Sequence, residues 1–242
     1  MILGTKEWRP HNENCEEGCE NDCLYCYAAL MAARYHRRKR EDWHIMKPNA
    51  RSKRPVRFLE GGVMFPTTHD LHAHHINWWS PFLTDLLAAG NEVLIVTKPD
   101  FAAVRFICDN FHSKINQIEF RFTIGTDEDR TRRYWEPNAP GIGERIHAMR
   151  YAFERGYKTS ASLEPLLMED PRRLIWQISP WISEGGTIWI GRMNHYKLNP
   201  KIPEEARQIT IQSRENLQGI YDSLKDYPQI RWKDSVRDLL GV

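Results

Sequence analysis

The sequence lacks any apolar run long enough to cross a bilayer, so we expect no membrane-spanning segment. Residues 1–10 also lack a basic region followed by an apolar stretch, so we expect no secretion signal and a cytoplasmic location. Neither sign of charge is in large excess, since the net charge is +2, and this argues against a large nucleic-acid footprint. Internal repeats and low-complexity tracts are absent, and 242 residues suit one large domain.

Cysteine is scarce, with five residues, but four of the five lie within residues 15–26. Cys19, Cys23 and Cys26 have the spacing CxxxCxxC. Clustered cysteines in a reducing compartment indicate metal ligands or redox groups rather than a disulfide framework. Three thiolates on one loop can hold three corners of a [4Fe-4S] cluster, and the fourth iron then stays open to a small molecule.

A structural zinc site is the alternative, and it requires four nitrogen or sulfur ligands. The sequence has no second CxxC pair, but Cys15 could supply a fourth sulfur. His72 and His74, from the run of four histidines at 69–75, could also join two of the cysteines in a Cys–His site. The fifth cysteine, Cys108, falls on the apolar face of an expected helix, where a buried free thiol is typical. The roles of Cys15 and of the histidines stay open.

From about residue 61 onward, short runs rich in β-branched residues alternate with segments of helical period. Helices between successive strands predict parallel pairing with right-handed crossovers. We therefore predict an α/β fold, a partial (β/α)6 TIM-type barrel with a short C-terminal helical extension. Residues 1–200 would form the barrel and its cluster loop, and residues 201–242 the extension, packed on the same domain. The expected strands lie near Val63, at 92–97, 118–124, 157–163 and 187–191, with a less certain one before the cysteine loop.

Three proline-containing turns predict helix starts, because proline at the first helical position loses no hydrogen bond. These turns are Lys98-Pro99-Asp100, Ser80-Pro81 and Asp170-Pro171. Further helices are expected at 140–155, which Gly156 ends, and from 203 to about 224.

The run CENDCLYCY at 19–27 resembles the cluster-binding motif of the radical S-adenosylmethionine (SAM) superfamily, in which three cysteines bind the cluster and SAM chelates the fourth iron. The sequence over roughly residues 15–194 resembles the branch that contains spore photoproduct lyase and its DNA repair photolyase relatives. The most diagnostic pieces are Glu136-Pro137, Ala139-Pro140, Glu144-Arg145 and Leu163 to Pro165.

This resemblance implies a radical SAM enzyme with Cys19, Cys23 and Cys26 as iron ligands and with a [4Fe-4S] cluster and SAM as cofactors. An external one-electron donor of the flavodoxin or ferredoxin type would reduce the cluster, and SAM would yield a 5′-deoxyadenosyl radical that abstracts hydrogen from a substrate.

Spore photoproduct lyase repairs a thymine dimer in DNA, so nucleic acid is a candidate substrate. The basic stretches at 34–40 and 51–57 could contact phosphates, and in the zinc alternative they would contact nucleic acid without catalysis. No cysteine ends the strand near Val63, where a lyase-like hydrogen donor is sought, which argues against dimer repair. No residue is therefore assigned to hydrogen transfer, and the substrate is left open.

The remaining cofactor contacts are expected at the C-terminal ends of the parallel strands, where such barrels place their chemistry. Tyr25, directly before the last cysteine, is expected near the adenine. Asp70 is a candidate for the methionine amine, with a helix cap or turn as the alternative. Glu164, between an apolar strand and proline, suits a ribose diol. The other candidates are strand-end residues. Thr97 and Lys98 could contact the ribose or carboxylate of SAM, and the Thr123 side chain matches the hydroxyl position of the family. Gly191 permits close approach of the backbone to a ligand.

Overall fold

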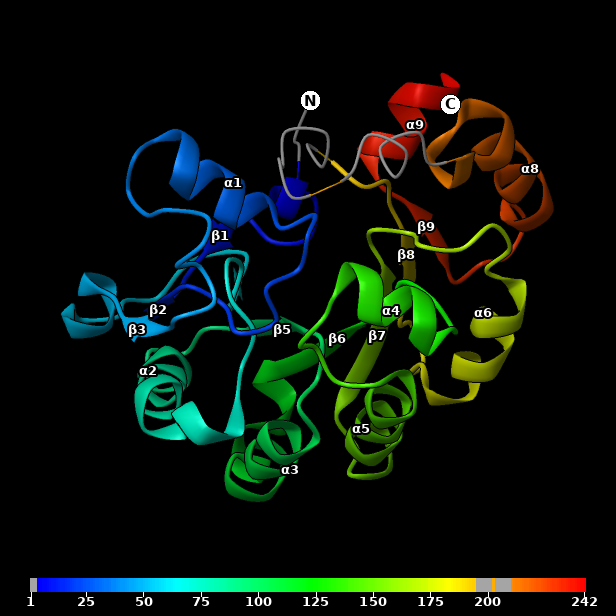
Figure 1. Ribbon diagram of the computed structural model, residues 1–242. Helices are drawn as coiled ribbons and strands as arrows, with labels where there is room; N and C mark the ends of the chain where they lie inside the picture. The colour runs from blue at the N-terminus through cyan, green and yellow to red at the C-terminus, as the bar shows by residue number, and fades with distance from the viewer. Residues whose placement is uncertain (1–3, 195–201, 203–209) are drawn as a thin grey trace.

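Seven parallel strands form one curled sheet, a half barrel, in the computed structural model, which describes residues 4–194, 202 and 210–242 (Figure 1). The strand order is β1-β4-β5-β6-β7-β8-β9, so every strand after β4 is added beside the strand that precedes it in the chain. The predicted α/β partial barrel is therefore confirmed. The strands of this sheet are β1 (His11–Asn12), β4 (Val63–Met64), β5 (Val93–Thr97), β6 (Ile118–Thr123), β7 (Lys158–Leu163), β8 (Ile188–Ile190) and β9 (Ile230–Trp232).

Most of the helices that connect these strands cover the outer face of the sheet (Figure 1). None of them, within the ranges described, is long and apolar enough to cross a membrane. A small antiparallel sheet of β2 (Glu16–Glu17) and β3 (Lys47–Pro48) lies beside the cysteine loop. The α-helices are α1 (Tyr27–Arg34), α2 (Ile76–Ala88), α3 (Phe101–Asn110), α4 (Asp129–Trp135), α5 (Ile142–Glu154), α6 (Arg172–Ile178), α8 (Arg214–Leu224) and α9 (Asp234–Leu240).

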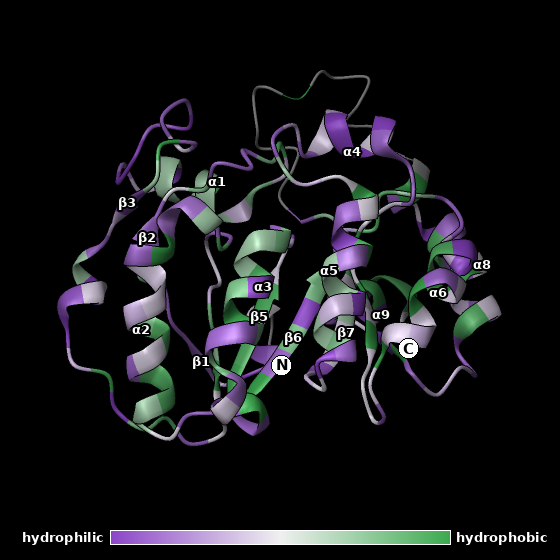
Figure 2. Cartoon of the chain, turned by 90° about the horizontal axis from the view of Figure 1, so that it is seen from below, coloured by the Kyte–Doolittle hydropathy of each residue, from purple (hydrophilic) through white to green (hydrophobic). Residues whose placement is uncertain are grey.

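Strand β6 shows how alternating side chains give the sheet an apolar outer face and a polar lumen. Phe120 and Phe122 are fully buried in the main hydrophobic core together with side chains of α3 and α5. Arg121, between them, points the other way, donates to Ser160 Oγ at 3.1 Å and pairs with Glu119 at 3.2 Å. Figure 2 shows hydrophobic residues concentrated on β5 and on α3, which packs against the sheet. The inner face is thus free to present polar groups at the strand ends.

The segment before β1 enters this lumen. The ring centroid of Trp8 lies 4.8 Å from the guanidinium carbon of Arg121 and 4.3 Å from Nζ of Lys233. Arg9 adds an ion pair to Glu119 at 3.4 Å. Because Lys233 directly follows β9, residues from both halves of the chain fill the inside of the half barrel.

The predicted helix starts have different outcomes. Helix α3 begins at Phe101, directly after the Lys98-Pro99-Asp100 turn, but Pro99 lies before the cap and not at the first helical position. The cap is Asp100, which accepts the backbone N–H groups of Ala102 at 2.9 Å and Ala103 at 3.3 Å. Helix α6 begins at Arg172, directly after the Asp170-Pro171 turn. The Ser80-Pro81 start is wrong, since α2 begins at Ile76 and contains Pro81. The helix continues through the proline because its apolar face, which includes Trp79 and Phe82, is buried in the core.

The barrel has one strand more than the six expected. Strand β9, within the segment taken as a helical extension, pairs in parallel with β8 and extends the sheet. The sequence suggested only a short piece there, because three residues between two helices carry little strand signal. Helix α8 accounts for the second half of the helix predicted from 203, while residues 203–209 and the boundary at 200/201 lie outside the described residues.

Candidate functional site

The three cysteines of the CxxxCxxC run line one cavity of about 650 Å³ at the C-terminal ends of the strands. All the predicted cofactor residues except Gly191 line it too: Tyr25, Asp70, Thr97, Lys98, Thr123 and Glu164. Cys26 Sγ also accepts the backbone N–H of Ala29 at 3.4 Å, so the last cysteine caps α1. Cys19 and Cys23 are buried, and all five cysteines are free thiols. Residues far apart in the sequence therefore meet where the barrel argument expected them.

The cysteine loop is held by arginines of the basic stretch. Arg40 is buried, pairs with Asp22 and donates to the backbone carbonyl of Cys23 at 3.0 Å. Arg38 donates to the carbonyls of Glu17, at 3.2 Å, and Ile45. These two arginines therefore stabilise the loop, and their side chains are not simply exposed for contact with nucleic-acid phosphates.

Gly18 sets the backbone entry to this loop. Its φ is +94°, and a Cβ atom there would lie 2.6 Å from the carbonyl oxygen of Ile45. Only glycine fits both the conformation and the close approach. The residue directly before Cys19 thus fixes the direction of the loop.

Asp70 connects the cysteine loop to the end of β5. Its Oδ1 accepts the hydroxyl of Thr97 at 2.9 Å and the backbone N–H of Lys98 at 2.6 Å. Its Oδ2 accepts Asn21 Nδ2 at 2.8 Å and lies 3.8 Å from Cys19 Sγ. Burial acts to raise the pKa of Asp70, but the Lys98 charge and these hydrogen bonds outweigh it and lower the pKa. Asp70 is therefore an ionised group with both oxygens engaged, and its contact with a methionine amine stays a prediction.

Lys98 brings a positive charge to the cavity wall. Its Nζ lies 3.9 Å from Asp70 Oδ2 and 5.7 Å from the ring centroid of Tyr25. Burial acts to lower the pKa of Lys98, but negative charge on Cys23, Asp70 and Glu136 raises it above the usual range. The ammonium therefore stays charged beside the thiols.

Tyr25 is linked to two of the diagnostic motif pieces. Its hydroxyl donates to Glu136, and the other oxygen of Glu136 pairs with Arg145, whose side chain is fully buried. Arg145 also donates to the carbonyl of Thr123, at the end of β6, at 3.2 Å. The Glu-Pro and Glu-Arg pieces thus supply a buried ion pair that fixes Tyr25 against the end of β6. Sequence reasoning noted these residues as motif markers but did not assign them a structural role.

Glu164 faces a lysine that the sequence did not single out. Lys233 Nζ lies 3.8 Å from Glu164 Oε2 and 2.9 Å from Glu7 Oε1. Burial raises the pKa of Glu164, while the Lys233 charge opposes that shift. Lys233 lies at the end of β9, so it could not be found while that strand was unrecognised.

Gly191 is placed behind Glu164. A Cβ atom at Gly191 would lie 2.8 Å from Cγ of Glu164 and 2.9 Å from Cγ of Lys233. The structure shows a close approach to these two side chains, which line the cavity, and the predicted approach to a ligand stays a prediction.

Ser162 is a cavity residue that sequence reasoning missed. It pairs with Thr123 across β6 and β7, and both line the cavity. The hydroxyl oxygen of Ser162 is buried and has no hydrogen-bond partner in the described part of the chain. The alternation of Ser160 and Ser162 along β7 was the available signal, since both share the lumen face with Arg121.

Cys15 and the histidines gather beside the cysteine loop. Cys15 is buried outside the cavity lining, in one possible ligand group with Glu16 and His69. Burial raises the pKa of the Cys15 thiol. Burial also raises the pKa of Glu16 to about 8; the Cys15 hydrogen bond opposes this shift and the Glu20 charge adds to it. His74 belongs to a second, more exposed group with Glu20 and His75. Over the described ranges, no such group joins His72 or His74 to a cysteine, so the zinc site suggested for these two histidines is not formed.

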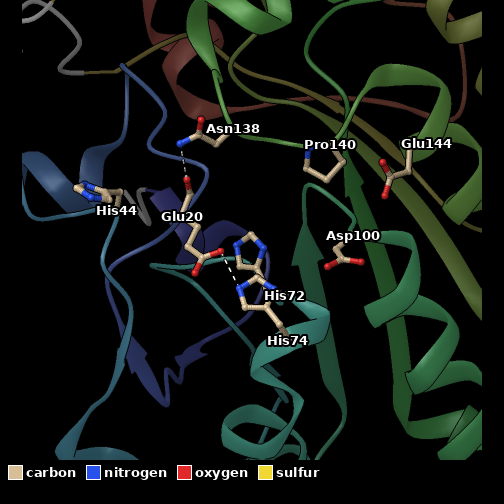
Figure 3. Close-up of a pocket in the computed structure, with 8 residues that line it drawn as sticks. All are labelled: Glu20, His44, His72, His74, Asp100, Asn138, Pro140 and Glu144. Atoms are coloured by element: carbon tan, nitrogen blue, oxygen red, sulfur yellow. Dashed lines mark hydrogen bonds and ion pairs between the residues drawn. The ribbon is translucent and has the colours of Figure 1, made fainter.

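The more exposed group borders a second cavity of about 570 Å³ (Figure 3). Glu20 lies at its centre, where its carboxylate contacts His74 at 2.8 Å and its backbone carbonyl accepts Asn138 Nδ2 at 2.9 Å. Asp100 and Glu144 line the opposite side. This second cavity is lined mainly by carboxylates and histidines and shares no lining residue with the thiol-lined one.

Solved structures with a similar arrangement of strands and helices include spore photoproduct lyases. A lyase complexed with dinucleoside spore photoproduct superposes with a TM-score of 0.63 and is 14% identical, over 90% of this chain and 74% of that chain. A variant of the lyase with one cysteine replaced by serine gives 0.61 and 13%, over 96% and 78%. This chain has the fold of spore photoproduct lyase. A third lyase structure, with bound AdoMet and dinucleoside spore photoproduct, gives 0.51 and 14%, over 99% and 62%.

Sequence comparison finds a relative that is described as uncharacterized. An uncharacterized protein of Methanocaldococcus jannaschii is 25% identical over 175 residues, which are 68% of this chain and 64% of that protein. The match thus spans less than two thirds of the relative's length. No family model matches the chain. The lyase resemblance therefore rests on the fold and on the motifs at the site.

Proposed function

We propose that this chain is a radical SAM enzyme that binds a [4Fe-4S] cluster through Cys19, Cys23 and Cys26 and binds SAM in the adjoining cavity. The observation that carries the proposal is the shared cavity, in which the three thiols meet polar side chains from successive strand ends. The lyase fold supports it, since one lyase structure of this fold has AdoMet bound.

The thiols suit an iron–sulfur cluster. Burial raises the pKa of all three, to about 12 for Cys23, so thiolates form here only against positive charge. A metal centre supplies such charge, and Lys98 adds to it. When bound, the cluster would supply reductive cleavage of the C5′–S bond of SAM, with one electron from a flavodoxin- or ferredoxin-type donor. The products are methionine and a 5′-deoxyadenosyl radical, which removes a hydrogen atom from the substrate.

The side chains around the cavity suit the polar ends of SAM. The Lys98 ammonium matches the methionine carboxylate, and Glu164 matches the ribose diol. The Ser162 hydroxyl, unpaired within the described residues, offers a further donor beside Thr123. Tyr25, held by Glu136, supplies a fixed aromatic wall for the adenine.

The substrate is proposed only as a class, nucleic acid, because lyase structures of this fold contain dinucleoside spore photoproduct. Thr67 and Thr68 follow β4 and line the cavity where a donor cysteine was sought. The reaction therefore need not be the lyase reaction.

The test is anaerobic reconstitution of the full chain with iron and sulfide, followed by dithionite and SAM. We expect the broad visible absorption of a [4Fe-4S] cluster and formation of 5′-deoxyadenosine. Alanine at Cys19, Cys23 or Cys26 should abolish both, whereas Cys15→Ala and Cys108→Ala should keep the cluster. Tight binding of zinc at the three cysteines, without formation of deoxyadenosine, would refute the proposal. Loss of the cluster in Cys15→Ala would contradict the assignment of the iron ligands.

A further inference from the structure

A second set of metal-ligand side chains lies beside the thiol-lined cavity proposed for SAM, and one of its members, His69, also contributes to the lining of that cavity. Cys15 precedes β2, Glu16 lies within it, and His69 follows β4. One ligand atom from each, a sulfur, a carboxylate oxygen and an imidazole nitrogen, lies within 4.8 Å of the other two. The exposed fractions are 0% for Cys15, 1% for Glu16 and 5% for His69. Three donors of different chemistry are thus buried together.

The bonding capacity of this trio is incompletely used. Glu16 Oε2 and His69 Nε2 are both buried without a hydrogen-bond partner among the residues that the structure describes. Glu16 Oε1 has only the Cys15 thiol, a weak donor, at 3.8 Å. No lysine or arginine in the described ranges forms an ion pair with Glu16; its only ion-pair contact there is His75 Nδ1, at 3.4 Å. Because an unpaired buried carboxylate costs several kcal/mol, at least about 2, burial favours the protonated form of Glu16. A bound cation would stabilise the ionised form.

We propose that Cys15, Glu16 and His69 bind a zinc ion, separate from the iron–sulfur cluster. Zinc takes sulfur, nitrogen and carboxylate oxygen together, at about 2.0–2.3 Å in a tetrahedron. Ligand atoms within 4.8 Å of one another need only small side-chain shifts to reach such distances. His75, beside Glu16 Oε2, or a water takes the fourth position. The ion would contact the two atoms that lack a hydrogen-bond partner, Glu16 Oε2 and His69 Nε2, and would supply positive charge to the Glu16 carboxylate.

A zinc ion here would fix segments that position the cluster loop. The carbonyl of Cys15 accepts the backbone N–H of Asn49 at 2.9 Å, which joins the segment to the turn after β3. His69 directly precedes Asp70, which holds the loop through Asn21. The ion therefore cross-links the approach to the loop with the turn after β4, and its role is structural.

The outer group of Glu20, His74 and His75 is the competing location. It is more exposed, and Glu20 is already paired with His74 at 2.8 Å (Figure 3). His74 belongs to this group alone and His69 to the buried trio alone, so one variant of each separates the two locations.

The test measures zinc and iron per chain in the full-length protein after cluster reconstitution and removal of free metal. We expect about one zinc and about four irons. Cys15→Ser and His69→Gln should lose at least nine tenths of the zinc and keep the iron, whereas Cys19→Ser should lose the iron and keep the zinc. Cys108→Ser, a matched buried cysteine, and His74→Gln should keep both.

Each other result overturns the proposal. Zinc that stays in Cys15→Ser and His69→Gln places it elsewhere, and loss confined to His74→Gln places it in the outer group. Absence of zinc from the unaltered chain, even after exposure to an excess of zinc, shows that the trio binds none.

Cobalt tests the trio independently of iron. In a chain with serine at Cys19, Cys23 and Cys26, added Co²⁺ should give near-ultraviolet thiolate charge transfer, and adding Cys15→Ser should remove it. A Co²⁺ band that persists without Cys15 would refute thiolate ligation by the trio. Neither readout depends on deoxyadenosine, so failure of the zinc site and failure of radical SAM activity are distinguishable.

Discussion

Glu136 shows how one side chain links a sequence motif to the site. It accepts the hydroxyl of Tyr25 and pairs with the fully buried Arg145. Removing one member of such a pair leaves the other as a buried, uncompensated charge. The position of Tyr25 in the cavity wall therefore depends on the ion pair of Glu136 and Arg145 behind it.

We expect Glu136→Gln to lower the free energy of unfolding by about 3 kcal/mol. The matched control is Glu154→Gln, since Glu154 pairs with Arg150 at 2.7 Å on the exposed face of α5. That change should cost no more than about 0.5 kcal/mol. Urea denaturation of the cluster-free chain measures both. Equal costs for the two variants would show that the buried pair carries no special weight.

Gly191 offers a residue-scale test of the proposed SAM site. In Gly191→Ala the new methyl group would press on Glu164 and Lys233, and we expect SAM affinity to fall by about tenfold, or about 1.4 kcal/mol. Gly219→Ala is the control, because a Cβ there meets nothing within 4 Å and α8 should gain up to about 1 kcal/mol of stability. Equilibrium binding of SAM to the reconstituted proteins checks this. Unchanged affinity in Gly191→Ala would remove Glu164 from the binding site.

At the scale of elements, the sequence predicts best where the chain repeats a pattern. Strand β5 is an apolar run and β6 alternates apolar with polar residues, so Thr97 and Thr123 could be placed at strand ends from these patterns alone. Lys233 could not, because β9 has three residues and no pattern of its own. The helix start predicted at Pro81 was wrong because burial of Trp79 and Phe82 outweighs the loss of the hydrogen bond that proline removes. The Glu16–His69 contact depends on tertiary packing between β2 and the turn after β4, which no local pattern reports.

Asp129 connects two elements and predicts a pH dependence. Partial burial acts to raise its pKa, but the backbone N–H of Ile142, at the start of α5, and the guanidinium of Arg132 on α4 outweigh it and lower the pKa. The stabilisation is therefore complete above about pH 4, the unfolded value, and is lost as the pH falls through the lower folded value. Asp129→Asn should cost up to about 1 kcal/mol at pH 7, and the difference from the unaltered chain should shrink toward pH 2–3. Urea denaturation across this pH range measures it, and a constant difference would contradict the charge argument.

At the scale of the whole molecule, the N-terminal segment and the last strand stabilise each other through Trp8. Its ring lies beside Arg121 of β6 and Lys233 after β9. We expect Trp8→Ala to lower the free energy of unfolding by about 2 kcal/mol or more, because it removes packing and two cation–π contacts from the lumen. Trp176→Ala is the control, since Trp176 is 81% exposed on α6 and its loss should cost no more than about 0.5 kcal/mol. Thermal or urea unfolding that ranks the two variants equally would exclude a structural role for the lumen contacts.

The contact between Lys233 and the N-terminal segment also sets an order of assembly during translation. Lys233 donates to the carbonyl of Gly4 at 2.7 Å, although 229 residues separate them. A nascent chain therefore carries Cys19, Cys23 and Cys26 out of the ribosome long before the residue that closes the opposite wall of their cavity has been synthesised. Because loop closure over such a distance comes late in folding, we expect the cysteines to be accessible to iron–sulfur delivery on the ribosome-bound chain. The proposed SAM site should close only after Lys233 has left the ribosome.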